Sequence, residues 1–453
     1  MRKSLRALIA LATVLSACTI STGSPSEQSP TARSKGEQSP PNVLIFVTDD
    51  QRADGTLEVM PKTRALFEQE GVTFSNAYVT TPLCCPSRAS ILTGQYAHNH
   101  GVLENQAGDE LDHRLTLEAK LHEAGYRTAI AGKFLQGRPI SVDPEHFDKW
   151  ALTGWGYYGR QFNVQGRMRV VRAYTTTFIQ RTSIRWLRSF ERKDDRPWFL
   201  YIAPTAPHRP YLPEHKYAKA SVPSWQENPA SRERNRRDKA SYVRQASYSE
   251  KNKSIYERQL RTLISVDDSV KRLFKVLSNL GEEHHTMAFF LSDNGHMNGE
   301  HGLFGKRMPY QQSVRIPLLM RWPGHVESGS IDPRLVANID IASTVFDGAS
   351  ISAGWPLDGN SLLSSDSRSY LLLEQYLNQP RPDWISLISR HDQYIEYLND
   401  EGSLEFAEYY DLRGDPWQLD NLLARDADTI PSKVAAARET LRDVTDCAGD
   451  NCP

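Results

Sequence analysis

Residues 84–94 read Cys-Cys-Pro-Ser-Arg-Ala-Ser-Ile-Leu-Thr-Gly, and the rest of the chain is organised around this stretch. Cys84 stands just before a segment that we expect to begin a helix, because proline is tolerated in the first helical turn. That turn has backbone N–H groups without intrahelical partners, and Arg88 adds a fixed positive charge. We therefore expect the stretch to hold an oxyanion beside Cys84.

Two strand-like runs far from this stretch each lead into oxygen-bearing side chains. Residues 43–47 and 287–291 are apolar runs, typical of strands buried on both faces. The first leads into Asp49-Asp50 and the second into Asp293-Asn294. If both strands lie in one parallel sheet, their ends meet. Three carboxylates and one amide oxygen then form a site that suits Ca²⁺ or Mg²⁺ rather than zinc.

Helices and strands alternate along most of the chain. Helices are expected at 61–70, 116–124 and 255–280, and further strands at 72–79, 126–131 and 198–203. The alternation predicts a sheet with helices on both faces, whose ligands gather at the carboxyl ends of the strands. Shorter strands around residues 370, 384 and 394, with a terminal helix from about residue 432, predict a smaller antiparallel α+β part.

Residues 84–94 match the sulfatase signature Cys-x-Pro-Ser-Arg followed by Leu-Thr-Gly, so the chain resembles the sulfatases. Cys84 stands where sulfatases form formylglycine. The Cys84-Cys85 doublet and residues 96–100, Tyr-Ala-His-Asn-His, are most similar to the N-acetylglucosamine-6-sulfatases. The resemblance implies an alkaline-phosphatase-like α/β fold, with a large mixed sheet sandwiched by helices and a smaller C-terminal α+β subdomain around an antiparallel sheet. It also implies hydrolysis of sulfate monoesters on a sulfated amino sugar or glycan.

The resemblance also implies roles for single residues. The expected metal site consists of Asp49, Asp50, Cys84, Asp293 and Asn294, which match the sulfatase metal site, and Ca²⁺ is preferred to Mg²⁺ on this ground. Asp293 is also a candidate base.

Four cationic or proton-donating residues match the sulfatase active site as well. Lys133, His208 and Lys306 match residues that hold the sulfate and protonate the leaving oxygen, and Arg88 would steady the modified Cys84.

One segment departs from the common sulfatase pattern. Many sulfatases read Gly-Lys-Trp-His where residues 132–136 read Gly-Lys-Phe-Leu-Gln. The glucosamine-6-sulfatase branch has Gly-Lys-Tyr-Leu-Asn, which this chain follows with Phe134 in place of Tyr and Gln136 in place of Asn. The missing histidine shifts the acid–base role to His208, or to His98 or His100, and the choice among them stays open.

The beginning of the chain predicts export. Residues 1–17 have a basic start and an apolar run, as a signal peptide does, and Leu15-Ser16-Ala17-Cys18 resembles a bacterial lipobox. Cys18 would then be the lipid-modified first residue, although a plain secretory signal is the alternative. Residues 18–40 are rich in Ser, Pro and Thr and predict a flexible tether. We therefore expect an exported bacterial lipoprotein, anchored to the cell envelope through its lipid.

The remaining cysteines agree with export. Cys447 and Cys452 enclose Ala-Gly-Asp-Asn, a spacing that suits a small disulfide loop and hardly suits a metal site. Beyond the tether, we expect a catalytic domain over residues 41–365 and a C-terminal subdomain over residues 366–453.

Composition and charge limit the partners. The chain has 453 residues, 39% hydrophobic and 24% charged, as expected for a globular protein. A net charge of −1 and a pI of about 6.9 provide no overall field for a polyanion, so no nucleic-acid partner is expected. Local basic residues must recognise an acidic substrate. The polar stretch 215–254 is expected to be mostly a solvated insertion, although its basic residues 232–244 could form the rim of a sulfated-sugar site.

The expected partners are a sulfated small molecule or glycan, the formylglycine-generating enzyme, and a membrane through the lipid anchor. One alternative function is a phosphomonoesterase or phosphodiesterase of the same superfamily, although such enzymes generally use a Ser or Thr nucleophile and zinc-binding histidines. A second is a lipid-anchored glycan-binding protein without catalysis. Exo or endo action and the oligomeric state stay open.

Overall fold

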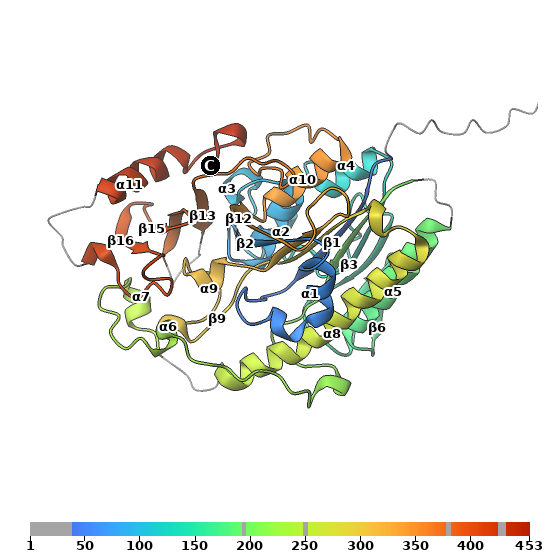
Figure 1. Ribbon diagram of the computed structural model, residues 1–453, viewed down its shortest axis with the longest axis horizontal. Helices are drawn as coiled ribbons and strands as arrows, with labels where there is room; N and C mark the ends of the chain where they lie inside the picture. The colour runs from blue at the N-terminus through green and yellow to red at the C-terminus, as the bar shows by residue number, and fades with distance from the viewer. Residues whose placement is uncertain (1–38, 193–195, 248–251, 377–381, 425–431) are drawn as a thin grey trace, which may run out of the picture. The chain divides into compact units, whose positions relative to one another are not determined.

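A large mixed sheet forms the centre of the structure, which is a computed structural model describing residues 39–192, 196–247, 252–376, 382–424 and 432–453. Within these residues the sheet has ten strands (Figure 1). In sheet order they are β12 (Ser330–Ala337), β2 (Val72–Tyr78), β11 (Leu318–Arg321), β8 (Thr286–Ser292), β1 (Asn42–Thr48), β7 (Trp198–Ala203), β3 (Arg127–Gly132), β4 (Lys149–Thr153), β5 (Arg160–Val164) and β6 (Arg167–Val171).

The two apolar runs expected as strands are neighbours in this sheet. β1 pairs in parallel with β8 on one side and with β7 on the other, and Thr48 lies opposite Ser292. Every residue of these three strands is buried, which explains why their sequences are apolar without alternation. The prediction that the runs at 43–47 and 287–291 lie in one parallel sheet is confirmed, and both acidic strand ends reach the same edge.

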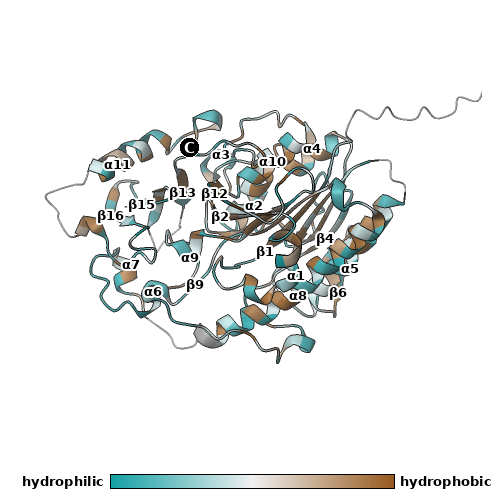
Figure 2. Cartoon of the chain, in the orientation of Figure 1, coloured by the Kyte–Doolittle hydropathy of each residue, from teal (hydrophilic) through white to brown (hydrophobic). Residues whose placement is uncertain are grey.

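Helices cover both faces of the sheet. Val43, Ile45 and Val47 of β1 belong to a core shared with α2 (Cys84–Thr93), α4 (Leu117–Glu123) and α10 (Asp340–Ala349). Leu44 and Phe46 point the other way, into a core shared with α1 (Pro61–Phe67), α5 (Thr175–Glu191) and α8 (Asn252–Leu280). In Figure 2 the helices of both layers carry hydrophobic and hydrophilic residues on the same helix, as amphipathic packing requires.

A second, antiparallel sheet follows the large one. Its strands are β13 (Leu371–Gln375), β14 (Asp383–Ile388), β15 (Asp392–Leu398) and β16 (Leu404–Asp411), and α11 (Ser432–Val444) contacts β14 and β15. The expected fold class, a large mixed sheet between helices with a smaller antiparallel α+β subdomain, is confirmed. The shorter elements are α3 (Ala97–His100), α6 (Pro229–Arg232), α7 (Ser241–Arg244), α9 (Gln311–Val314), β9 (Met297–Asn298) and β10 (Phe304–Gly305).

Three predictions concern segments outside the described residues. The signal peptide at 1–17, Cys18 and nearly all of the tether lie there. Within the described part of the chain, no helix combines the length and apolarity needed to cross a membrane.

Most described residues of the polar stretch 215–254 are exposed or half-buried, as expected, but the part around Lys239 differs. Its Lys239 is fully buried, and the ammonium donates to the Asp238 carboxylate and to the Leu419 carbonyl, both at 2.7 Å. The backbone N–H of Ala240 donates to the Glu408 side chain on β16 at 3.0 Å. This part of the stretch therefore packs against the antiparallel sheet, because its backbone and charges find buried partners there.

The C-terminal tail is attached to α3. Cys447 and Cys452 form a disulfide, and the Cys447 carbonyl lies 2.9 Å from His98 Nε2 and 2.8 Å from Asn99 Nδ2. The other ring nitrogen of His98 lies 2.8 Å from the Glu374 carboxylate. Burial alone would lower the pKa of His98, but the hydrogen bond to Glu374 and the charge of that carboxylate raise it to about 9. The protonated ring therefore joins the tail to α3.

We expect this ion pair to make stability depend on pH. The pKa of His98 lies above its unfolded value of 6.5, so its contribution is complete below pH 6.5 and is lost as the pH rises through 9. His98→Leu should lower the free energy of unfolding by about 2 kcal/mol at pH 6 and by less than about 1 kcal/mol at pH 10, measured by urea denaturation. His284→Leu, at an exposed site, should have little effect at either pH. An equal loss at both pH values for His98→Leu would contradict this role of the charge.

Candidate active site

Three carboxylates meet around Cys84 at the edge where β1 and β8 end. Asp49, Asp50, Asp293 and Cys84 are all buried, and one ligand atom of each lies within 4.8 Å of the others. The backbone N–H of Asp50 donates to Asp293 Oδ1 at 3.1 Å, which links the two strand ends. Cys84 joins them as the first residue of α2, with its Sγ 3.4 Å from Asp49 Oδ1.

The fourth oxygen-bearing residue, Asn294, tests whether this cluster fits a metal ion. Its Nδ2 donates to Asp50 Oδ1 at 2.8 Å, whereas its Oδ1 is buried without a hydrogen-bond partner. An unpaired buried amide oxygen is costly, and a cation would satisfy it. Carboxylate and amide oxygens are hard ligands, so the cluster fits a hard divalent cation.

Three basic side chains balance the three carboxylates. Lys133 Nζ lies 2.7 Å from Asp49 Oδ2, and the Lys306 ammonium contacts Asp50. Lys306 Nζ is also 2.6 Å from Cys84 Sγ. With charges already matched, a bound divalent cation would leave the cluster positive, and such a site attracts an anion.

Arg88 supplies the third positive charge from α2. Its Nε lies 2.9 Å from Asp293 Oδ2, and its Nη1 donates to the Lys133 carbonyl at 3.1 Å. Both side chains of the Arg88–Asp293 pair have no solvent exposure. The guanidinium therefore connects the beginning of α2 to the ends of β8 and β3.

The protonation states follow from burial and charge. Burial alone would raise the pKa of Asp49, but Lys133 and His208 outweigh it and lower the value to about 2. Lys306 and His208 likewise lower the pKa of Asp50 against its burial. Burial and the Asp293 charge raise the pKa of the Cys84 thiol to about 12, against Lys133 and Lys306. Asp49 and Asp50 are therefore ionised, and an unmodified Cys84 keeps its thiol proton at neutral pH.

His208 lies at the open side of the cluster. Its Nδ1 is 2.8 Å from the Arg209 carbonyl, which can only accept, so Nδ1 carries a hydrogen. The other nitrogen, Nε2, lies 3.8 Å from Asp50 Oδ2. His208 lies in the segment that follows β7. The Asp49 N–H donates to the carbonyl of Ala206 in this segment at 3.1 Å, which joins it to the end of β1. His208 is thus the predicted histidine that reaches the cluster.

His98 and His100 are occupied elsewhere. His98 binds Glu374 and the tail through its two ring nitrogens. His100 Nε2 lies 3.0 Å from Ser90 Oγ, and its Nδ1 accepts from the backbone of Val102 at 3.1 Å. Both rings have structural partners, so the structure does not support the acid–base role considered for them.

The loop between β8 and Lys306 is held by residues far away in the sequence. Arg52 Nη1 donates to the His296 carbonyl at 2.7 Å, and its Nη2 pairs with Glu300 at 2.9 Å. Asn228 Nδ2 donates to the same carboxylate at 2.9 Å. The first half of the loop is thereby fixed to β1 and to the polar stretch.

Arg236 holds the second half of the loop. Its Nη1 donates to the His301 carbonyl at 2.7 Å, and its Nη2 to the Ala246 carbonyl at 2.6 Å. Glu233 lies 2.8 Å from His301 Nδ1. At Gly302, φ is +72°, and a Cβ there would lie 1.7 Å from Arg236 Nη1, so this approach requires glycine. Arg236 therefore fixes the backbone at His301, five residues before Lys306. The spacing of residues in the sequence did not predict this role.

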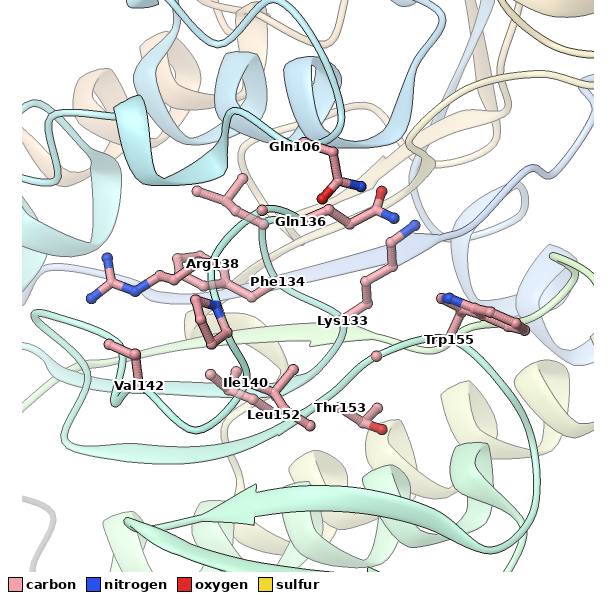
Figure 3. Close-up of a pocket in the computed structure, with 14 residues that line it drawn as sticks. Gln106, Lys133, Phe134, Gln136, Arg138, Ile140, Val142, Leu152, Thr153 and Trp155 are labelled. Carbon is pink, nitrogen blue, oxygen red and sulfur yellow. The ribbon is translucent and has the colours of Figure 1, made fainter.

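A cavity of about 220 Å³ opens beside Lys133. Figure 3 shows Trp155 and Arg138 on opposite sides of it, with the Lys133 side chain between them. Much of the remaining wall is apolar, and it includes Phe134, Leu135, Pro139, Ile140, Val142 and Leu152. Phe134, Leu135 and Gln136, at which the chain departs from the common sulfatase pattern, therefore line this cavity.

Comparison with known proteins agrees with this geometry. The family model described as Sulfatase matches residues 41–351, and the model described as N-sulphoglucosamine sulphohydrolase, C-terminal, matches residues 299–443. The N-acetylglucosamine-6-sulfatase of Homo sapiens is 31% identical, over 91% of this chain and 86% of its own length. The N-acetylglucosamine-6-O-sulfatase of Bacteroides thetaiotaomicron is 25% identical, over 86% of this chain and 84% of its own.

Solved structures share the fold. One, described as a complex with its substrate D-glucosamine-2-N,6-O-disulfate, has a TM-score of 0.76 at 23% identity and covers 89% of this chain and 97% of its own. The phosphonate monoester hydrolase of Agrobacterium radiobacter has a TM-score of 0.70 at 22% identity, covering 89% and 95%.

We expect Arg236→Ala to reduce kcat/KM for 4-nitrophenyl sulfate by about tenfold or more, because a misplacement of about 1 Å at a reacting group is costly. Stopped assays of sulfate release would measure the loss, and circular dichroism would check the fold. The neighbouring, exposed Arg237→Ala is the matched control and should stay within about twofold. If Arg236→Ala were as active as Arg237→Ala, the loop would not depend on this guanidinium.

Proposed function

We propose a substrate and a mechanism for this chain, which belongs to the sulfatase family and is a sulfuric ester hydrolase. The substrate is a 6-sulfated glucosamine, free or at the end of a glycan, and the nucleophile is formylglycine made from Cys84. The observation that carries the proposal is the position of Cys84 at the beginning of α2, among three carboxylates and beside Lys306.

Named relatives support the substrate class. Two relatives that cover most of this chain are N-acetylglucosamine-6-sulfatases, from a mammal and from a bacterium. The structure described with D-glucosamine-2-N,6-O-disulfate shares the fold. The similarity to a phosphonate monoester hydrolase concerns the fold alone. Hydrolysis of phosphorus esters is therefore an alternative that the activity test must distinguish.

The residues around position 84 fit the modification. Cys84, Pro86 and Arg88 keep the motif that a formylglycine-generating enzyme would read, which makes that enzyme a proposed partner. A hydrated aldehyde supplies two hydroxyls on one carbon, one to attack sulfur and the other to expel sulfate by its ionisation. Asp49 rather than Asp293 is placed to take a proton from residue 84, because its Oδ1 is 3.4 Å from Cys84 Sγ whereas both oxygens of Asp293 bind Asp50 and Arg88.

The basic residues of the chain bind and orient the sulfate group. Lys133 and Lys306 flank residue 84 and would neutralise the sulfate oxygens as charge moves onto them. Arg88 holds the beginning of α2 in place. The N–H groups of Cys85 and Ser87 donate to Asn105 and to the Leu83 carbonyl, so side chains rather than the first turn of the helix would bind the sulfate. With both ring nitrogens protonated, His208 would donate the Nε2 proton to the departing sugar oxygen, while the Nδ1 hydrogen stays bonded to the Arg209 carbonyl.

A divalent cation fits the oxygen cluster, and we propose Ca²⁺, with Mg²⁺ as the alternative. The ligands would be Asp49, Asp50, Asp293 and the unpaired Oδ1 of Asn294, beside residue 84. When bound, the cation would supply positive charge against the sulfate oxygens.

We also propose that the protein is an exported lipoprotein held to the cell envelope. The support is the residue pattern at 1–18, with its basic start, apolar run and Leu-Ser-Ala-Cys end. A lipid anchor would keep the enzyme close to glycans outside the cell.

The metal assignment predicts a loss of cation affinity in Asn294→Leu. This change keeps a similar volume but removes the amide oxygen, so calcium affinity measured by calorimetry should fall at least about tenfold. Asn360→Leu, at an exposed asparagine, should bind calcium like the parent. Equal calcium affinity in Asn294→Leu and the parent would exclude Asn294 as a ligand.

The function is tested by coexpression with a formylglycine-generating enzyme. We expect the tryptic peptide containing residue 84 to have the mass of formylglycine, and sulfate to be released from N-acetylglucosamine 6-sulfate. Cys84→Ala should lower kcat by at least about a thousandfold. An unmodified thiol in fully active enzyme would overturn the nucleophile, and faster hydrolysis of 4-nitrophenyl phosphate than of the sulfate would overturn the reaction.

A further inference from the structure

The connection from β4 to β5 places an exposed tryptophan at the active site. Trp155 lies between two glycines, is 47% exposed and lines the cavity beside Lys133 (Figure 3). Its ring centroid is 6.4 Å from that of His208. A single exposed aromatic residue is common on protein surfaces, but this one lies beside both Lys133 of the charge cluster and the proposed proton donor.

Two guanidinium groups lie beside the same indole. The Cζ atoms of Arg160 and Arg209 are 5.9 and 6.0 Å from its ring centroid. At Gly156, with φ at +123°, a Cβ would lie 2.8 Å from Arg160 Cδ, so glycine leaves the room that Arg160 needs. Aromatic faces attract cations, so Trp155 helps to hold both charges at this spot.

These two charges have no carboxylate partner in the described part of the chain. Neither Arg160 nor Arg209 forms an ion pair there, and Arg160 Nε is buried without a hydrogen-bond partner. Arg138, on the opposite side of the cavity, is different, since it pairs with Glu145 at 3.2 Å and contacts His113. Positive charge available to a ligand is therefore concentrated around Trp155.

We propose that Trp155 is the stacking platform for the amino-sugar ring, and that Arg160 and Arg209 bind a second oxyanion on the same glycan. This inference rests on the proposed function. The oxygen attached to the sulfate must lie next to His208 Nε2, and the sugar ring that carries it then extends over the neighbouring indole. Sugar C–H groups pack well on aromatic faces, and guanidinium groups bind sulfate or carboxylate in a bidentate manner.

The platform is tested with Trp155→Ala and Trp155→Phe in the formylglycine-containing enzyme. For N-acetylglucosamine 6-sulfate, we expect Trp155→Ala to raise KM about tenfold while kcat stays within about threefold. Trp155→Phe keeps an aromatic face and should stay within about threefold of the parent KM. An unchanged KM in Trp155→Ala, or an equal rise in both variants, would overturn the platform.

The second anion site is tested with the double variant Arg160→Gln/Arg209→Gln. Its KM for D-glucosamine-2-N,6-O-disulfate should rise at least about tenfold, with little change for N-acetylglucosamine 6-sulfate. A disaccharide bearing a uronate in place of the N-sulfate distinguishes the source of the oxyanion. Arg169→Gln, at an exposed arginine on β6 that lies over Phe178, is the matched control. Equal KM changes for the singly and doubly anionic sugars would overturn the second anion site.

A binding measurement separates the inference from the proposed reaction. Calorimetry with D-glucosamine-2-N,6-O-disulfate would compare Cys84→Ala with Cys84→Ala/Trp155→Ala. A tenfold weaker Kd in the double variant supports the platform whether or not the parent hydrolyses this sugar. Equal Kd values would overturn the platform even if the parent hydrolyses this sugar. If no 6-sulfated sugar were a substrate, that result would count against the proposed function instead.

Discussion

The parallel pairing of β1 with β8 is the constraint on which the site depends. Because parallel neighbours end at the same edge, residues more than 240 positions apart become adjacent, and the Asp50 N–H donates to Asp293. The residues that follow each strand are therefore placed by the sheet rather than by a flexible loop. α2 then needs only to begin at this edge for Cys84 to enter the cluster.

Charge balance explains why so many ionised groups can be buried together. Three carboxylates are matched by Arg88, Lys133 and Lys306, and removing one member would leave a buried charge unpaired, at a cost of about 3–5 kcal/mol. The basic groups come from α2, from the end of β3 and from the loop after β8. Packing of separate elements therefore makes the anion site, and no single segment contains it.

Sequence was sufficient for the strand ends, since Asp49 and Asp293 follow apolar runs typical of strands buried on both faces. It was not sufficient for Arg236, whose partners His301 and Ala246 are set by how the polar stretch folds back. Composition suggested a solvated insertion there, whereas tertiary contacts bury Lys239. The motif at residues 96–100 was likewise ambiguous, because a histidine that binds a tail and one that donates a proton look alike in sequence.

The burial of Cys84 has a consequence for the order of events during synthesis. Its side chain is only 1% exposed, and Lys306, which contacts its Sγ, is translated more than 200 residues later. Any enzyme that modifies Cys84 must therefore reach it on a chain in which β8 and the following loop have not yet closed over it. The rate at which the C-terminal half folds would then set the time available for maturation, so a faster-folding variant could be more stable and yet contain fewer mature molecules.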